Sequence, residues 1–505
     1  MASNCENFLL SVDNGGTYIK ATLIDLHGNQ VGIAKHFNKM LHDCDGYAEY
    51  DLEDLWQTNC RCIREVLLQT GVSPEQIACV GFAGQGKGVY PVDENGRPFM
   101  RAISSSDTRS YKYGQIWLQN GVSQSLYPKL YQNATASQPA CILAWLKDHQ
   151  PENYRRIRWV FSMKDYLLFR MTGNATAGKG SQSGTCLVNL NTGEYDEELL
   201  SAYGIPEIRE KLAPMVWDTE ICGEVRPEAS ELCGLNVGTP VSAGMFDVDA
   251  SAIAMGVIDS SSIFTIAGTN GVSGYIDSKP VTNGSIALNS LYSLPGTYLI
   301  EEGSPASAGA LEWVLDVLFD RKREDSAIYD QINSMVESLS PAQTNLVFLP
   351  YLTGSSESPI SRGGWIGLRP EHTRAHMLRA VYEGVAFVHA IRIGRLLQNR
   401  EKPQCVRMAG GATNSKPWVQ MFADVLNLPV EACAREEMGA KGVAICSSVA
   451  AGLYPDIRTA VDAMKSPRRL VLPRPEVVPE YAEKFQIFQS VADKMHAIWP
   501  EFLHE

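Results

Sequence analysis

The chain has 505 residues, of which 57 are acidic and 44 basic, so its formal net charge at pH 7 is −13. This balance excludes a broad basic surface for nucleic acid or an anionic membrane, although backbone N–H groups or a bound cation can still hold a phosphate locally. The length exceeds what one hydrophobic core supports, so we expect two domains with a central cleft, residues 1–250 and 251–505.

The 12 cysteines are scattered and show no repeated CxxC spacing, which indicates reduced thiols rather than a zinc ribbon or a disulfide framework. Residues 1–7 contain no basic segment, and the apolar run Phe8–Val12 is too short for a signal sequence or a membrane span. We therefore expect a cytoplasmic protein whose partners include neither nucleic acid nor a membrane.

Along the chain, short apolar runs bounded by Gly and Asp alternate with helical patterns, which is typical of α/β architecture. Phe8–Val12 predicts a buried strand, Asp13–Thr17 a turn, and Tyr18–Asp25 the returning strand of a hairpin. Helical spacing follows over residues 53–70. Ile77–Phe82 then predicts a strand that runs into a glycine-rich turn, where small residues leave room for a ligand.

A hairpin of the same plan recurs in the second half of the chain. Ser262–Ala267 predicts a strand that breaks at Gly268-Thr269-Asn270-Gly271, and Val272–Tyr275 resumes an extended pattern. The paired Gly/Thr turns predict two related lobes, each offering backbone donors and a hydroxyl to one polyphosphate. Either turn alone would be an ordinary β-turn, so the pairing carries the prediction.

Two carboxylates are candidates for phosphoryl-transfer chemistry. Asp13 lies in the first turn, where a carboxylate beside phosphates makes sense if Mg²⁺ sits between them, directly or through water. Asp247 follows a predicted strand around Val241. An N-cap is the ordinary role for such an Asp, but Asp249 is better placed to cap a helix over Ala250–Met255. We therefore predict that Asp247 is a general base that accepts the proton of a sugar hydroxyl.

Two further motifs are interpreted as structural. Residues 173–180 resemble a Walker A loop, but Gly180 stands where Mg²⁺ needs a hydroxyl, and Ser/Gly-rich sequence follows where a helix is required. His372 and His376 have the i, i+4 spacing of metal ligands, but the glutamate of the HExxH motif is missing. We expect this pair to mark the start of a helix.

Taken together, the sequence resembles the FGGY family of carbohydrate kinases over essentially its whole length. One family signature matches Gly363–Leu368 followed by His376–Glu383, and the other matches Ser137–His149 except that Ile142 stands where many members have Lys. The resemblance implies an α/β fold of two actin-like (ribonuclease H-like) domains. Sugar binding and the catalytic base would lie in the first domain, and nucleotide binding mainly in the second. It also implies the cofactors ATP and Mg²⁺, a small-molecule sugar or polyol as partner, and possible homodimers.

The resemblance assigns roles to individual residues. Asp13 is the implied metal ligand and Asp247 the implied catalytic base. Gly410 and Gly411 would let the backbone approach a flat ring closely, and Asn414 can hydrogen-bond an adenine edge. The alternative is that this segment is a plain Gly-rich turn. The implied ATP-binding residues are Asp13, Gly16, Thr17, Lys20, Gly268, Thr269, Gly309, Gly410, Gly411 and Asn414.

The substrate class depends on the string Gln85-Gly86-Lys87-Gly88. Together with residues 102–109 and 244–248, this string is most similar to the L-xylulose kinase branch, which implies transfer to the C5 hydroxyl of a ketopentose. A lysine donates hydrogen bonds but cannot accept them, so Lys87 should change which epimer is satisfied, unless it is an exposed structural lysine. The implied substrate residues are Gln85, Gly86, Lys87, Asp107 and Asp247.

Two alternatives stay open at the level of the sequence. Erythritol kinases also carry a Gln-Gly-x-Gly string, so a polyol is a possible acceptor. A different class of function is an actin-like ATPase, or a sugar-sensing protein that binds ATP without phosphorylating anything. Release of ADP with and without a panel of sugars separates these readings.

Overall fold

The computed structural model describes residues 7–319, 327–358, 360–433 and 436–504. The chain forms two compact units whose segments alternate along the sequence. Unit 1 contains residues 1–258, 276–300 and 436–465, and unit 2 contains residues 259–275, 301–435 and 466–505. The expected division near residue 250, with its separate roles for the two halves, stays a prediction.

Unit 1 is built on a mixed sheet with the strand order β13-β14-β5-β1-β2-β3, and β15 pairs with the end of β5. The predicted hairpin is present, because β1 and β2 pair antiparallel with Asp13 opposite Lys20. β1 also pairs in parallel with β5. The strands are β1 Phe8–Asn14, β2 Tyr18–Asp25, β3 Gln30–Phe37, β5 Ile77–Gly84, β13 Ile221–Glu224, β14 Pro240–Ser242 and β15 Met245–Phe246.

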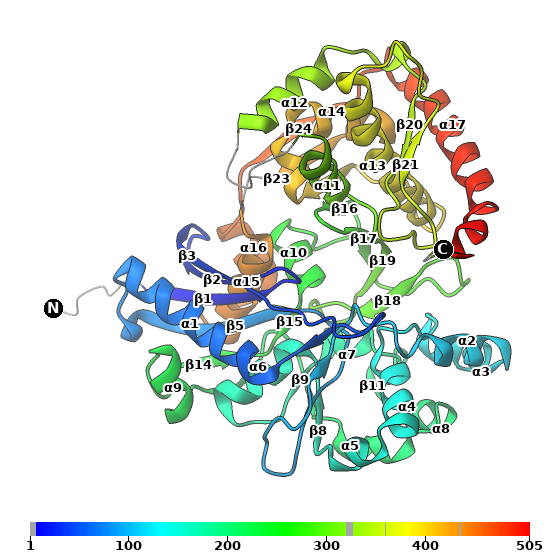
Figure 1. Ribbon diagram of the computed structural model, residues 1–505. Coiled ribbons are helices and arrows are strands. Elements are labelled where there is room, and N and C mark those ends of the chain that lie inside the picture. Colours follow the sequence, from blue (N-terminus) through cyan, green and yellow to red (C-terminus); the bar gives the residue numbers. More distant parts are fainter. Residues whose placement is uncertain (1–6, 320–326, 359, 434–435, 505) are drawn as a thin grey trace. The chain divides into compact units, whose positions relative to one another are not determined.

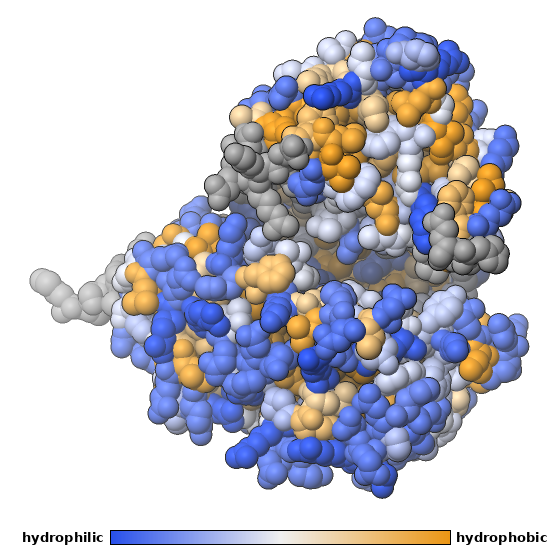
Figure 2. Space-filling model, in the orientation of Figure 1, coloured by the Kyte–Doolittle hydropathy of each residue, from blue (hydrophilic) through white to orange (hydrophobic). Residues whose placement is uncertain are grey.

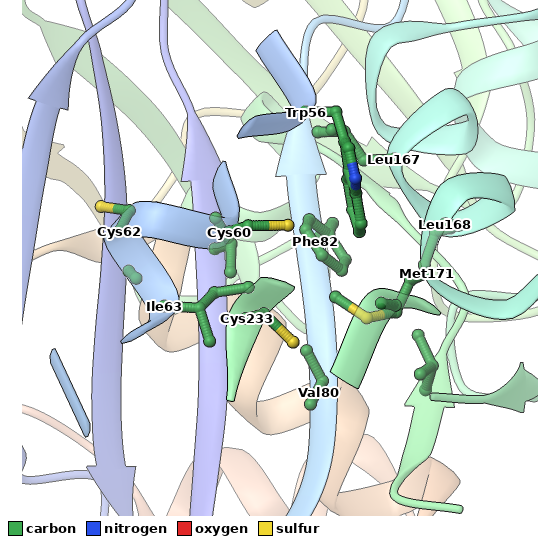
Figure 3. Close-up of a cluster of buried hydrophobic side chains, with 14 of the residues drawn as sticks. Trp56, Cys60, Cys62, Ile63, Val80, Phe82, Leu167, Leu168, Met171 and Cys233 are labelled. Carbon is green, nitrogen blue, oxygen red and sulfur yellow. The ribbon is translucent and has the colours of Figure 1, made fainter. Parts of the chain in front are cut away.

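Helices cover both faces of this sheet. Side chains alternate along β5, so Val80 and Phe82 enter a core with Trp56 and Leu167 (Figure 3), whereas Gly81 faces the opposite helix layer. In Figure 1 that second layer includes the orange α15 and α16 beside the blue strands of the same unit. The helices are α1 Leu52–Thr70, α6 Met163–Thr172, α9 Pro227–Cys233, α10 Asp247–Ala254, α15 Met438–Ala450 and α16 Ile457–Ala463.

A second group of elements in unit 1 packs around a separate apolar core that includes Trp117, Ile142 and Leu187. Its helices are α2 Tyr111–Gln119, α3 Val122–Leu130, α4 Pro139–His149, α5 Pro151–Arg156 and α8 Glu197–Ala202, and the short α7 Lys179–Ser183 lies outside this core. Short strand pairs accompany them: β4 Glu49–Tyr50 with β7 Ala102–Ile103, β6 Tyr90–Val92 with β8 Trp159–Phe161, β9 Ala177–Gly178 with β12 Met215–Val216, and β10 Val188–Asn189 with β11 Glu194–Tyr195.

Unit 2 repeats the plan of sheet and helices. Its strands lie in the order β19-β17-β16-β22-β23-β24, with the second predicted hairpin formed by β16 and β17. The strands are β16 Ser262–Ala267, β17 Gly271–Asp277, β19 Tyr298–Ser304, β22 Cys405–Ala409, β23 Val430–Cys433 and β24 Arg468–Val471. A small pair joins β20 Val347–Leu349 to β21 Gly364–Ile366. The helices are α11 Gly309–Leu318, α12 Ala327–Glu337, α13 Arg374–Leu397, α14 Lys416–Leu426 and α17 Val478–His496.

The structure tests several local predictions. The helix expected over residues 53–70 is α1, whose N-cap Asp51 accepts from two backbone N–H groups. The helix expected after His372 begins at Arg374, and His376 takes part in its capping box with Thr373.

Two predictions were wrong. Asp249 does not cap α10, because that helix already begins at Asp247 and Asp249 lies inside its first turn, buried. A helix, α7, begins within the last two residues of the Walker-like segment and continues into the Ser/Gly-rich sequence after it, although it is only five residues long. It starts at Lys179, whose ammonium pairs with Glu194.

The cysteines in the described residues are free thiols, as the sequence predicts. There are eleven of them, and Cys44 is the exposed one. In that part of the chain, no helix combines the length and the apolar character that crossing a membrane needs. On the visible face in Figure 2, hydrophilic side chains cover most of unit 1 and hydrophobic ones occur in small groups.

Candidate active site

The first of the two predicted phosphate-binding turns lies between β1 and β2. Gly15 donates its backbone N–H to the Tyr18 carbonyl at 3.1 Å, and Asn38 Nδ2 donates to the Gly15 carbonyl at 2.8 Å. Gly16 and Thr17 are exposed at the tip. Hydrogen bonds therefore hold the base of the turn in place while its tip is accessible, as binding of a phosphate to backbone N–H groups requires.

The carboxylate of Asp13 lies against the first turn of α15. A Cβ atom on Gly439 would lie 2.7 Å from Asp13 Oδ2, so only glycine allows this approach. Lys20, a predicted phosphate residue, has its Nζ 2.6 Å from Glu437 Oε2, just before the same helix. Burial raises the pKa of Asp13, Lys20 lowers it and Glu437 raises it. A cation beside this half-buried carboxylate would stabilise its charged form.

The predicted base lies next to predicted sugar residues at the carboxyl end of β5. β15 pairs in parallel with β5, with Phe246 opposite Gly84, so Asp247 begins α10 beside the turn that contains Gln85 and Gly86. A Cβ atom on Gly86 would lie 2.9 Å from the Phe246 ring. Asp247 is half-buried and occupies the first helical residue, where the helix dipole stabilises a carboxylate.

Gln85 and Lys87 present different polar groups beside this turn. Gln85 Oε1 accepts from Ser105 Oγ at 2.7 Å and from Ser104 Oγ at 3.3 Å, which fixes the orientation of its amide. Lys87 is half-buried and lies close to Cys186. Burial raises the pKa of the Cys186 thiol to about 12, and the charge of Lys87 opposes this increase. Within the described residues, no carboxylate forms an ion pair with Lys87. Its ammonium group is therefore available to a substrate.

Asp107 differs from the other predicted substrate residues because the protein already occupies its oxygens. Its buried carboxylate accepts from the Ala48 N–H at 2.7 Å and from the Arg109 guanidinium at 2.9 and 2.7 Å. Arg109 also lies 3.5 Å from the ring centroid of Tyr47 and pairs with Glu49. These contacts give Asp107 a structural task, and a contact with substrate stays a prediction.

Buried charges support the loop that leads to α10. Lys164 Nζ donates to Asp165 Oδ1 at 2.6 Å, and both side chains are fully buried. A Cβ atom on Gly244 would lie 2.9 Å from the aliphatic chain of Lys164. Burial raises the pKa of the nearby Asp218 to about 6. Breaking the Lys164–Asp165 pair would leave a buried charge uncompensated, so the network fixes the position of this loop.

Unit 2 contains a cavity of about 610 Å³. The size is within the usual range for small-molecule sites. Predicted ATP-binding residues line it, namely Gly268, Thr269, Gly309, Gly411 and Asn414. The structure thus brings together residues from three separate segments of the sequence.

The second hairpin and the start of α11 meet at this cavity. Gly309 donates its N–H to the Gly268 carbonyl at 3.3 Å, and a Cβ atom on Gly309 would lie 2.8 Å from the Thr269 carbonyl oxygen. Thr269 itself is exposed. The N-terminus of α11 therefore lies against the turn, and the N–H groups of Gly268 and Gly309 already donate to the carbonyls of Asn270 and Gly268. The helix dipole and the exposed Thr269 still favour a chain of phosphates here.

A buried histidine ties the hairpin to α11. His389 Nδ1 lies 2.8 Å from Thr265 Oγ1 on β16, and Nε2 lies 2.9 Å from Ser307 Oγ, two residues before α11. Burial and the charge of Arg392 lower the pKa of His389 to about 4, so the ring is neutral at pH 7. A neutral imidazole donates from one nitrogen and accepts at the other, which satisfies both hydroxyl groups.

Gly410 is required by its backbone. Its φ angle is 97°, and a Cβ atom there would lie 2.5 Å from the Ala267 carbonyl oxygen. Its neighbour Gly411 would meet no atom within 4 Å. The glycine pair therefore serves two purposes, because Gly410 lets β22 pass close to β16 and Gly411 lines the cavity.

An amide from α12 forms another part of the cavity wall. Asn333 Oδ1 accepts from the Tyr382 hydroxyl at 3.0 Å and from Ser415 Oγ at 2.6 Å. The ring of Tyr382 stacks on that of Trp418 with centroids 4.2 Å apart and planes at 22°, and both residues also line the cavity. The amide is thus held by groups from two other helical segments.

The sequence interpretation missed the residues that hold these groups in place. Phe246 lies beside Asp247 within the motif at residues 244–248, and this position in the sequence could have identified it. Asn333 and His389 lie within ordinary helical patterns, and Gly439 lies far from Asp13 in the sequence. Only the folded chain brings these last residues to the sites.

The comparisons with known proteins identify one family. The N-terminal domain model of the FGGY family of carbohydrate kinases matches residues 8–254, and the C-terminal domain model matches residues 263–451. Similar proteins include the L-xylulose/3-keto-L-gulonate kinase of Escherichia coli (strain K12), which is 35% identical over 491 residues covering 96% of each chain. The probable L-xylulose kinase of Pasteurella multocida (strain Pm70) is 34% identical over 97% of this chain and 100% of that protein.

Solved structures share the fold. The ligand-bound xylulose kinase from Lactobacillus acidophilus superposes with a TM-score of 0.89 at 22% identity, over 98% of this chain and 100% of that one. The glycerol kinase of Plasmodium falciparum with ADP gives 0.83 at 18% identity, over 97% of this chain and 98% of that one. The predicted fold class, α/β with two actin-like domains, is confirmed.

Proposed function

Because the chain belongs to the FGGY family of carbohydrate kinases, we propose that it transfers the γ-phosphoryl group of ATP to the terminal hydroxyl of a ketopentose such as L-xylulose. The observation that carries the proposal is the cavity of unit 2, which gathers glycines and a threonine from three segments around one volume. The glycine-lined hairpin and the N-terminus of α11 suit a phosphate chain.

The acceptor side of the proposal rests on unit 1. Asp247 lies next to Gln85 and Gly86 at the end of β5, where it can take the proton of a hydroxyl that attacks the γ-phosphorus. Gln85 and Lys87 provide polar groups that can orient the sugar. Transfer requires the acceptor hydroxyl and the phosphoryl group to meet in line, and the protein contributes position and charge rather than covalent chemistry.

Asp13 fits a magnesium site of the kind that phosphates complete. Mg²⁺ in such enzymes is commonly bound by one or two carboxylates together with phosphate oxygens. In the described part of the chain, no group of three or more acidic, His or Cys side chains is arranged to hold a metal without a ligand. When bound with ATP, the ion would neutralise charge on the phosphates, and Asp13 would hold it beside the first turn.

The name of the Escherichia coli relative includes a sugar acid as well as a pentulose. Lys87 supports a sugar acid as a second possible acceptor, because its half-buried ammonium forms no ion pair with the described residues. A substrate carboxylate would supply the missing charge, whereas a pentulose would offer only hydroxyl oxygens. A 3-keto sugar acid is therefore a second candidate substrate.

A rate assay tests the catalytic role. We expect ADP release to depend on sugar, and Asp247→Asn to lower this rate by roughly 10²-fold or more through loss of the base. The exposed Asp462→Asn of α16 is the matched control and should keep the wild-type rate. A near-normal rate for Asp247→Asn would refute the assignment of the base, and ADP release without any sugar would favour an ATPase.

A panel of acceptors tests the substrate class. L-xylulose, D-xylulose, 3-keto-L-gulonate, erythritol and glycerol are compared with wild type and with Lys87→Met. If a carboxylate contacts this lysine, the substitution should raise KM for the sugar acid by roughly tenfold more than for the pentulose. Equal effects on both would argue that Lys87 does not contact the carboxylate, and a polyol preference would refute the pentulose proposal.

A further inference from the structure

Two chemically different kinds of residue line the cavity of unit 2. Gly268, Thr269 and Gly309 carry no charge and lie at the N-terminus of α11, whereas Glu312 and Asp330 carry carboxylates. A triphosphate would be repelled by those carboxylates, so its favourable place is beside the glycines and Thr269. The nucleoside then extends toward α12, which carries Asp330.

Asn333 also lines the cavity, about one helical turn after Asp330 on α12. Its carbonyl oxygen accepts from the Tyr382 hydroxyl and from Ser415 Oγ at 3.0 and 2.6 Å. Ser415 in turn caps α14 by accepting from the Trp418 N–H at 3.3 Å. Both donors bind the carbonyl oxygen of the Asn333 amide. The NH₂ group of the amide is therefore left for another partner.

The remaining side of the amide carries two N–H donors. Within the described residues, no group accepts from Asn333 Nδ2, although the side chain is half-buried and lines the cavity. A half-buried amide donor without a partner favours a ligand that brings an acceptor. The base of a nucleotide presents such acceptors as ring nitrogens.

We propose that Asn333 is a base-reading residue, which donates from Nδ2 to a ring nitrogen of the purine while Tyr382 and Ser415 hold its carbonyl. This inference rests on the proposed ATP site and adds a specificity-determining contact to it. Tyr382 holds the amide through its hydroxyl, and its ring stacks on that of Trp418 with centroids 4.2 Å apart.

Asn333→Asp tests the contact with little change of shape. The carboxylate still accepts from both hydroxyl groups but has no N–H to donate. Calorimetry should show ATP affinity reduced by roughly 2- to 12-fold, the value of one hydrogen bond, or more if the carboxylate repels the ring nitrogen. Gln331→Glu is the matched control, because it adds the same charge two residues earlier at an exposed position outside the cavity lining. Its ATP affinity should match that of wild type.

Analogues identify the acceptor atom. We would measure binding of 1-deaza-, 3-deaza- and 7-deaza-ATP, each of which lacks one ring nitrogen. The analogue that lacks the contacted nitrogen should bind wild type weakly and should be insensitive to Asn333→Asp. The other two should lose as much affinity as ATP does. Tyr382→Phe, which frees the carbonyl on one side, should weaken ATP binding less than Asn333→Asp.

The outcomes separate the two proposals. Unchanged ATP affinity in Asn333→Asp, or an equal loss for ATP and all three analogues, would overturn the base contact. A wild-type protein that binds ATP but phosphorylates no sugar would overturn the proposed function, and the binding comparison would still decide the role of Asn333. A wild-type protein that binds no ATP would overturn both.

Discussion

Replacement of His389 by glutamine should change how stability depends on pH. The imidazole bridges Thr265 and Ser307 with two hydrogen bonds of 2.8 and 2.9 Å, and burial lowers its pKa to about 4. Above the ordinary pKa of about 6.5 the ring is neutral in both states, so the folded state keeps its full stability. As the pH falls toward 4, the unfolded chain gains a proton that the folded chain excludes, and stability is lost.

The size of this effect follows from the two pKa values. A span of about 2.5 pH units at about 1.4 kcal/mol each gives ~3 kcal/mol lost by wild type between about pH 6.5 and pH 4. Glutamine can donate to one hydroxyl and accept from the other but does not titrate in this range. His389→Gln should therefore be less stable than wild type at about pH 7.5, by ~1 kcal/mol, and should gain ~3 kcal/mol relative to it at acid pH.

Urea unfolding followed by tryptophan fluorescence at about pH 7.5 and about pH 4.5 measures this difference. His389→Leu serves as the severe variant, because it leaves the buried Ser307 hydroxyl without its hydrogen-bond partner. It should lower the free energy of unfolding by ~2–4 kcal/mol at neutral pH. His27→Gln removes an exposed histidine and should follow wild type at both pH values. The reasoning fails if the gap between wild type and His389→Gln is the same at the two pH values.

Other positions give matched tests. Gly439→Ala would place a Cβ atom 2.7 Å from the Asp13 carboxylate and should abolish most activity if Asp13 has its proposed role, whereas Gly394→Ala, which meets no atom within 4 Å in helix α13, should stabilise the fold by up to ~1 kcal/mol. Gly410→Ala combines a φ of 97° with a contact at 2.5 Å and should lower the melting temperature, while Gly411→Ala should melt as wild type does; equal melting of the two would contradict the strain argument. Burial raises the pKa of Asp218 to about 6 from an ordinary 3.8, so stability falls as the pH rises between these values. Asp218→Asn should therefore be ~3 kcal/mol more stable than wild type at pH 7, a gain that vanishes near pH 4 in urea titrations.

The sequence alone predicted the elements that depend on local pattern. Apolar runs and Gly/Thr turns identified both hairpins, and the helix over 53–70 was found to within one residue. The chain length predicted two domains, and the family motifs predicted their actin-like fold. Boundaries were weaker, as Asp249 shows. A short polar residue caps a helix only where the backbone turns, and here β15 pairs with β5 up to Phe246, which is the N-cap, so that the helix begins at Asp247.

The tertiary structure decided how distant residues meet. Gly439 lies more than four hundred residues from Asp13, and no local pattern announces that a helix start will press against that carboxylate. The same holds for His389 and Asn333, whose partners come from other strands and helices. Periodicity and turn chemistry are short-range properties of the chain, whereas burial, pKa and hydrogen-bond partners depend on packing. The sequence therefore determined the class of chemistry, and the fold determined which side chains hold it in place.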